Sequence, residues 1–229
     1  MSTPSWLRLA QCKSARRTCD VPGCFRTVQK WGRYCDAHDD RCQRTGDPRG
    51  HTVTKGELAP YLSSVYRFLD ENGDHPAIMG AYDVLDRLLQ SAKPRRVWSG
   101  SKSPWERTNN WLVHLRESHV EPKDMMATLV AMFLYQELSP EAFRSDKHFR
   151  HQMVVRLLRL APIRRDPFTH RRKDRITVGV RDFLSERLCH SKLGALALRI
   201  AKHIAQDENQ KNDFLRCDID GYHVPFNHN

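Results

Sequence analysis

Residues 124–138 read DMMATLVAMFLYQEL and decide the fold class. Seven apolar side chains recur in this stretch at helical spacing: Met125, Met126, Leu129, Val130, Phe133, Leu134 and Leu138. Apolar residues three and four positions apart lie on one face of an α-helix. The stretch therefore predicts a strong helix, in which we expect Met125 and Met126 to be core residues rather than a groove for a partner.

The same spacing continues on both sides of this helix. Two earlier helices are predicted by Leu62, Val65, Tyr66 and Leu69, and by Ile78, Met79, Tyr82, Leu85, Leu88 and Leu89. Ser103-Pro104 marks the start of another, because Ser caps free amides and Pro suits the first turn. Later helices are expected from Ser139 through Leu158, and over residues 174–206 with a break near His190.

Strand patterns are weak after residue 50, so residues 51–229 predict an all-α helical domain. The turn-rich stretch TGDPRG at 45–50 separates it from residues 1–50, which are rich in Cys and Arg. The predicted fold class is mostly α: a small N-terminal zinc finger, treble-clef or knuckle-like, followed by the helical domain. We expect the tail from Asp218 to be irregular.

Five of the seven cysteines lie before residue 43, and three of them form two closely spaced ligand pairs together with His38. Cys19 and Cys24 flank a Pro-Gly turn, and Cys35 precedes His38 by three residues. Two short pairs with a spacer between them are what tetrahedral Zn²⁺ needs. We therefore predict a zinc site, without which a module of this size buries too little core to fold. Cys12 and Cys42 remain, and either is an alternative ligand.

The same residues carry a resemblance to a known family. The pattern Cys19-x4-Cys24, Cys35-x2-His38, followed by Arg-Thr-Gly-Asp-Pro at 44–48, resembles a small zinc finger of phage and mobile-element proteins. The match covers about residues 17–50. The resemblance implies contact with nucleic acid and a phage or mobile-element origin, since such fingers often accompany HNH nucleases. Residues 51–229 resemble no family that we recognise.

The charge of the chain is strongly basic and unevenly distributed. The 229 residues include 38 Lys and Arg against 27 Asp and Glu, a net charge of +11, with an isoelectric point near 9.5. Residues 1–50 carry a net charge of +5 and residues 144–181 a net charge of +9. Concentrated positive charge is typical of a phosphate-binding surface. An anionic membrane surface or an acidic protein is the competing interpretation.

We expect two groups of cations to contact nucleic acid, with DNA favoured over RNA. The first group lies in the zinc module: Arg26, Lys30, Arg33, Arg41 and Arg44. The second group lies in the helical domain: Arg164, Arg165, Arg171, Arg172, Lys173 and Arg175. Arg156 and Arg159 are expected to extend the second group along one helical face.

No catalytic motif is apparent, so an enzyme is not expected. The sequence lacks a P-loop, a nucleophile elbow and a compact HNH unit. The favoured function is accessory or regulatory nucleic-acid binding, in the cytoplasm of a bacterium or a phage-infected host. One alternative is an adaptor or inhibitor that docks on a host nucleic-acid machine, such as RNA polymerase or a defence complex. A second alternative is a nuclease with an unrecognised site.

Overall fold

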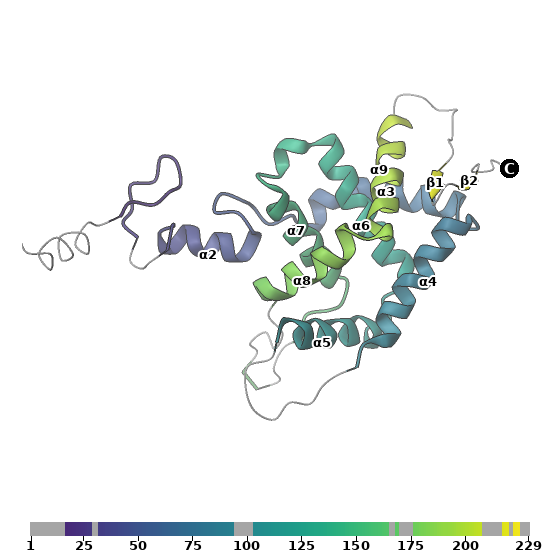
Figure 1. Ribbon diagram of the computed structural model, residues 1–229, viewed down its shortest axis with the longest axis horizontal. Helices are drawn as coiled ribbons and strands as arrows, with labels where there is room; N and C mark the ends of the chain where they lie inside the picture. The colour runs from purple at the N-terminus through teal and green to yellow at the C-terminus, as the bar shows by residue number, and fades with distance from the viewer. Residues whose placement is uncertain are drawn as a thin grey trace, which may run out of the picture. The chain divides into compact units, whose positions relative to one another are not determined.

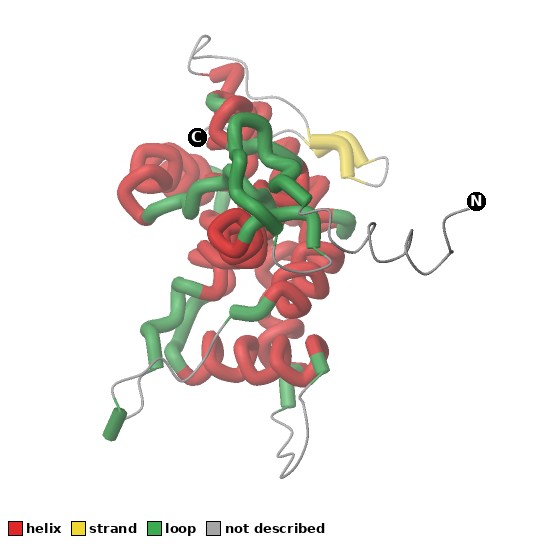
Figure 2. Tube along the Cα trace, turned by 90° about the vertical axis from the view of Figure 1, so that its left-hand side faces the viewer, coloured by secondary structure: helices red, strands yellow, loops and turns green. Residues whose placement is uncertain are grey.

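The computed structural model describes residues 17–28, 32–93, 103–164, 168–169, 176–207, 217–219 and 222–224. The chain forms two compact units, Met1–Thr52 and Val53–Asn229. Helices make up most of the described chain (Figure 2), which confirms the mostly α fold class. Within the described residues, no helix combines the length and the apolar character needed to cross a bilayer.

Both units contain helices. The first unit contains α2 (Asp36–Thr45). The second contains α3 (Lys55–Glu71), α4 (Pro76–Ser91), α5 (Pro104–Glu117), α6 (Pro122–Leu138), η1 (Pro140–Ala142), α7 (Asp146–Leu158), α8 (Val178–Cys189) and α9 (Lys192–Asp207). Two short strands, β1 (Cys217–Ile219) and β2 (Tyr222–Val224), follow in the same unit.

Helix α6 is the centre of the second unit. Every residue from Met125 to Leu134 is buried, and α3, α4, α7 and α9 all pack against this helix (Figure 1). A helix that is apolar on all sides is stable only when neighbours cover it on all sides. The prediction that Met125 and Met126 belong to the core is confirmed, since both are fully buried.

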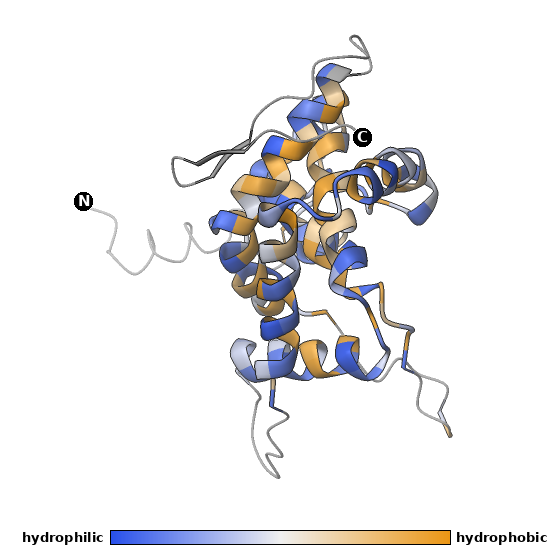
Figure 3. Ribbon diagram, turned by 90° about the vertical axis from the view of Figure 1, so that its right-hand side faces the viewer, coloured by the Kyte–Doolittle hydropathy of each residue, from blue (hydrophilic) through white to orange (hydrophobic). Residues whose placement is uncertain are grey.

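Several helices around α6 have one hydrophobic side and one hydrophilic side, as Figure 3 shows, whereas α7 is buried along most of its length. In α4 the buried residues are Ile78, Ala81, Leu85 and Leu89. Met79 is 52% exposed, so its predicted place on the buried face is wrong. Met79 follows Ile78 by a single position, which turns its side chain about 100° away from the core-facing stripe.

Helix α5 begins where the sequence predicted. The side chain of Ser103 accepts a hydrogen bond from the amide of Glu106, and the carboxylate of Glu106 accepts one from the amide of Ser103. This capping box satisfies two amides that the first helical turn leaves free. Near the other end of α5, Arg116 donates to three carbonyl oxygens at the end of α4, from Leu89 to Ala92.

Helix α7 begins later than expected. Pro140–Ala142 forms only a short 3₁₀ turn, and Phe143 after it is extended. The α-helix starts at Asp146, where the Ser145 side chain accepts a hydrogen bond from the amide of His148. The predicted single helix from Ser139 is therefore wrong. Ser145 provides the stronger start because its hydroxyl caps the turn that follows.

The predicted break near His190 is confirmed, since α8 ends at Cys189 and α9 starts at Lys192. Gly194 makes this tight junction possible. A Cβ atom at Gly194 would lie 2.4 Å from the carbonyl oxygen of Leu188 and 2.5 Å from that of Cys189. Only a residue without a side chain allows the first turn of α9 to approach the end of α8 so closely.

The end of the chain contains a strand pair that we did not expect. Strands β1 and β2 are antiparallel, with Cys217 opposite Val224 and Ile219 opposite Tyr222. The expectation of an irregular tail from Asp218 is therefore wrong for these residues. The two intervening residues in the sequence are Asp-Gly, the pair that favours a two-residue hairpin loop.

Candidate metal centre

The first pair of predicted ligands lies on a short hairpin loop, closed at its base by an antiparallel bridge between Thr18 and Thr27. At its tip, the amide of Cys24 donates to the carbonyl oxygen of Val21 at 3.0 Å. Gly23 has a φ of 78°, the left-handed conformation that Gly supplies after Pro in a type II turn. The turn reverses the chain and so brings the Sγ atom of Cys24 close to that of Cys19.

The second pair lies at the start of α2. Cys35 is the N-cap residue of this helix, and its carbonyl oxygen accepts a hydrogen bond from the amide of His38 at 2.9 Å. Residues three apart in the first turn lie on the same face of the helix. The amide of Asp20 donates to the carbonyl oxygen of Arg33 at 3.0 Å, which joins the segment before α2 to the hairpin loop.

The two pairs converge on one point. The ligand atoms of Cys19, Cys24, Cys35 and His38 all lie within 4.8 Å of one another. His38 Nδ1 is 3.4 Å from the Sγ atoms of both Cys19 and Cys35, and the Sγ atoms of Cys24 and Cys35 are 3.9 Å apart. This arrangement of three thiols and one imidazole is compatible with a metal ion.

The thiols in this cluster differ in acidity. Burial raises the pKa of Cys19, but hydrogen bonds with the backbone of Cys35 and Val21 and with His38 outweigh it, and the pKa falls from 9.0 to about 6. A backbone hydrogen bond at Arg26 lowers the pKa of Cys24, but burial and the neighbouring thiols leave it raised. Because thiolates bind metals, the environment of Cys19 favours the ligand form at neutral pH.

Among the residues that the structure describes, the apolar core around the cluster is very small. It consists of the buried side chains Cys19, Val21 and Cys35, with the partly buried Cys24, Val28 and Tyr34 packed against them. Two of the three buried side chains are themselves members of the cluster. A core of this size contributes little to the stability of an independent unit.

The structure tests only one of the two alternative ligands, Cys12 and Cys42. Cys42 lies in α2 and is half-buried, but it is not a member of the cluster. Cys12 lies outside the described residues. Within the part of the chain that the structure describes, Cys19, Cys24, Cys35 and His38 form the one group of at least three His, Cys, Asp or Glu residues close enough to hold a metal.

The predicted phosphate contacts of this unit are on its surface. Arg26, Arg41 and Arg44 are exposed. Arg33 is also exposed, but its Nε donates to the carboxylate of Asp20 at 3.0 Å. Lys30 lies outside the described residues. Four of the predicted arginines are thus accessible, and Arg33 among them already has an acidic partner.

Of the second predicted group of cations, which runs from Arg164 to Arg175, the structure describes only Arg164. Arg164 is half-buried and pairs with Glu117. Arg165, Arg171, Arg172, Lys173 and Arg175 lie outside the described residues. Of the two residues expected to extend this group, Arg159 is exposed but Arg156 is half-buried, and burial lowers its pKa. The Nε atom of Arg156 is buried, so Arg156 is less accessible to a phosphate than Arg159.

Sequence reasoning missed two features. Phe25, next to Cys24, is 89% exposed, although nothing in its spacing distinguishes it from a core aromatic. A polar pocket lies between α7 and α8, lined in part by Lys147, His151 and Asp182. These residues come from segments about 30 positions apart, so no local motif could have indicated the pocket.

Comparison with known proteins finds no matching family model, no matching curated protein and no matching solved structure. The resemblance of residues 17–50 to the phage and mobile-element zinc finger therefore stays a prediction.

Proposed function

We propose that the Cys19, Cys24, Cys35 and His38 cluster binds one structural Zn²⁺. With Zn–S bonds of about 2.3 Å and Zn–N bonds of about 2.0 Å, a regular tetrahedron has S···S edges of about 3.8 Å and S···N edges of about 3.5 Å. The corresponding separations here are 3.9 Å and 3.4 Å. Four protein ligands leave no open position, so the ion stabilises the fold and does not activate water.

We further propose that the chain is an accessory or regulatory nucleic-acid-binding protein of a phage or mobile element. The observation that carries this proposal is the net charge of +9 over residues 144–181. Most of α7 is buried in the core, whereas Arg144, Lys147 and Arg159 are exposed at or next to its ends. Concentrated surface cations attract phosphates through release of condensed counterions.

A protein-docking function is the second candidate, and Phe25 is the observation that favours it. This side chain is 89% exposed on the loop that carries Cys24, and aromatic residues are enriched in protein interfaces. The described acidic residues of this unit also offset much of its positive charge. Under this alternative the finger would contact a protein partner and the helical unit would contact its acidic surface.

The contribution of residues 144–181, the basic segment, to nucleic-acid binding can be tested directly. Replacing Arg171, Arg172 and Lys173 together with Gln should flatten the dependence of nucleic-acid affinity on salt concentration, because fewer phosphates are neutralised and fewer counterions are released. We expect the slope of log K against log salt to fall by about 1 for each phosphate that is no longer neutralised, up to about 3. Fluorescence anisotropy over a salt series measures this slope.

A matched variant controls for net charge. Arg67 lies on α3, Arg87 lies on α4, and Lys93 lies shortly after α4, all far in sequence from the basic segment. Replacing these three with Gln removes the same charge, and we expect it to leave most of the slope intact. An unchanged slope in the first variant, or equal reductions in the two variants, would remove the basic segment from the proposed interface.

A further inference from the structure

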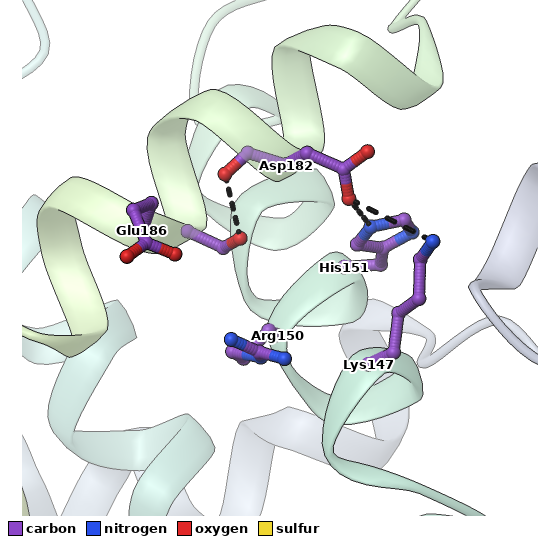
Figure 4. A pocket seen from close by; sticks show the side chains of 6 residues that line it. Lys147, Arg150, His151, Asp182 and Glu186 are labelled. Atoms are coloured by element: carbon purple, nitrogen blue, oxygen red, sulfur yellow. Dashed lines mark hydrogen bonds and ion pairs between the residues drawn. The ribbon is translucent and has the colours of Figure 1, made fainter.

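A polar pocket of about 250 Å³ lies where α7 packs against α8. Its lining comes from both helices: Lys147, Arg150, His151, Asp182, Ser185 and Glu186. Figure 4 shows Asp182 and Glu186 on one helix facing Lys147, Arg150 and His151 on the other. None of these residues belongs to the metal cluster, so the pocket is a separate feature of the second unit.

The deepest side chain of the pocket is His151, which is 1% exposed. Its Nε2 lies 2.6 Å from Oδ1 of Asp182, and its buried Nδ1 has no hydrogen-bond partner. Burial lowers the pKa of His151, although Asp182 opposes this effect. Burial therefore disfavours the charged imidazolium, and Nε2 is the ring nitrogen that faces the Asp182 carboxylate as a hydrogen-bond donor. The Asp182 carboxylate is thus already engaged before any ligand arrives.

The two cations of the pocket have spare hydrogen-bonding capacity. Nη1 of Arg150 lies 3.2 Å from Nε2 of His190, which occupies one of the five donors of a guanidinium. Nζ of Lys147 is 4.0 Å from Asp182 and its side chain is 51% exposed, so this contact is long and solvated. Glu186 is the one exposed acidic side chain of the pocket that has no role in the His151–Asp182 pair.

We propose that this pocket binds a single phosphate group, with Arg150 and Lys147 as its donors. A planar guanidinium can bind two phosphate oxygens at once, and a nearby ammonium adds a point charge. A cavity of about 250 Å³ accommodates one tetrahedral anion with a few attached atoms, but not a duplex. The ligand is therefore a phosphate monoester, either at the end of a nucleic-acid strand or in a free nucleotide.

This inference deepens the proposed function, on which it rests, by naming a contact for a terminal phosphate. The test uses the full zinc-loaded chain and two pairs of probes. One pair is a ten-nucleotide strand with a 5′-phosphate and the same strand with a 5′-hydroxyl. The other pair is adenosine 5′-monophosphate and adenosine. Within each pair the phosphate is the only difference, so attraction to the backbone cancels.

We expect the phosphorylated member of at least one pair to bind roughly tenfold tighter or more, the effect of a charge-assisted hydrogen bond. Replacing Arg150 with Gln should abolish this preference, and replacing it with Lys should restore part of it. Replacing the exposed Arg199 of α9 with Gln should leave the preference unchanged. Replacing Glu186 with Gln should increase it, because a like charge beside the phosphate is removed.

Equal binding within both pairs would overturn the proposal, as would a preference that survives Arg150→Gln and Arg150→Lys unaltered. The pocket and the nucleic-acid function can fail separately. Steep, salt-dependent strand binding without a phosphate preference would reject the pocket but keep nucleic-acid binding. A preference for adenosine 5′-monophosphate without strand binding would keep the pocket but reject the nucleic-acid function.

Discussion

Replacing Cys24 with Ser is expected to release the zinc ion and unfold residues 17–52, while the helical signal of the second unit stays largely intact. Cys24 supplies one of four converging ligand atoms, and the apolar core beside it contains only three buried residues among those that the structure describes. Binding of structural zinc contributes roughly 10–16 kcal/mol to small modules of this kind. A core this small cannot replace that contribution.

Zinc per chain, measured by elemental mass spectrometry, and limited proteolysis together report the effect. Circular dichroism at 222 nm follows the helices of the second unit. The matched control is Cys42→Ser, since Cys42 lies in α2 but outside the cluster, and this variant should keep its zinc. Unchanged zinc content in the Cys24 variant, or release of zinc from the Cys42 variant, would show that the ligand assignment is wrong.

Replacing Phe149 with Ala is expected to lower the free energy of unfolding of the second unit by about 3–5 kcal/mol. Phe149 is 4% exposed. The centroid of its ring lies 5.2 Å from those of both Phe133 and Phe143, so it joins α6 and α7 through aromatic contacts. Truncation removes buried apolar area and leaves a cavity that rigid neighbours cannot fill.

Urea denaturation of the zinc-loaded protein measures this decrease. The matched control is Phe168→Ala, because Phe168 is 91% exposed and its removal should change the free energy by less than about 0.5 kcal/mol. If the two variants unfold at the same urea concentration, the assignment of Phe149 to the core is incorrect. A midpoint shift without a change in the urea slope would confirm that only stability has changed.

The central part of the fold could be predicted because the relevant signals are local. The repeated apolar residues of 124–138 predicted a core helix, and the structure buries Met125–Leu134 on all sides, which requires neighbouring helices around it. The start of α5 was equally clear, since Ser103 and Glu106 satisfy each other's backbone amides. In both cases the physical cause lies within a few turns of helix.

Other boundaries depended on competition between local signals. Pro140 suggested a helix start, but the cap at Ser145 is the one from which α7 extends. In α4 the pattern of large apolar residues included Met79, whereas the small Ala81 lies in the core. Packing against α6 determines which face of α4 is buried, and α6 is distant from α4 in the sequence.

The metal cluster and the α7–α8 pocket also differ in whether their residues lie close together in the sequence. The metal cluster was predictable because a Pro-Gly turn and a first helical turn each bring two ligands together within six residues. The α7–α8 pocket was not predictable, because Arg150 and Glu186 meet only after the two helices pack. Their residue types carry no signal until the geometry shows His151 buried against Asp182.

The central claim is that the chain binds nucleic acid. The most direct test measures binding of the zinc-loaded chain to labelled duplex DNA, single-stranded DNA and RNA over a series of salt concentrations. We expect binding at low salt that weakens steeply as salt rises, with DNA preferred over RNA. Absence of binding to all three at low salt would contradict the proposed function, and the basic surface would then belong to a protein partner.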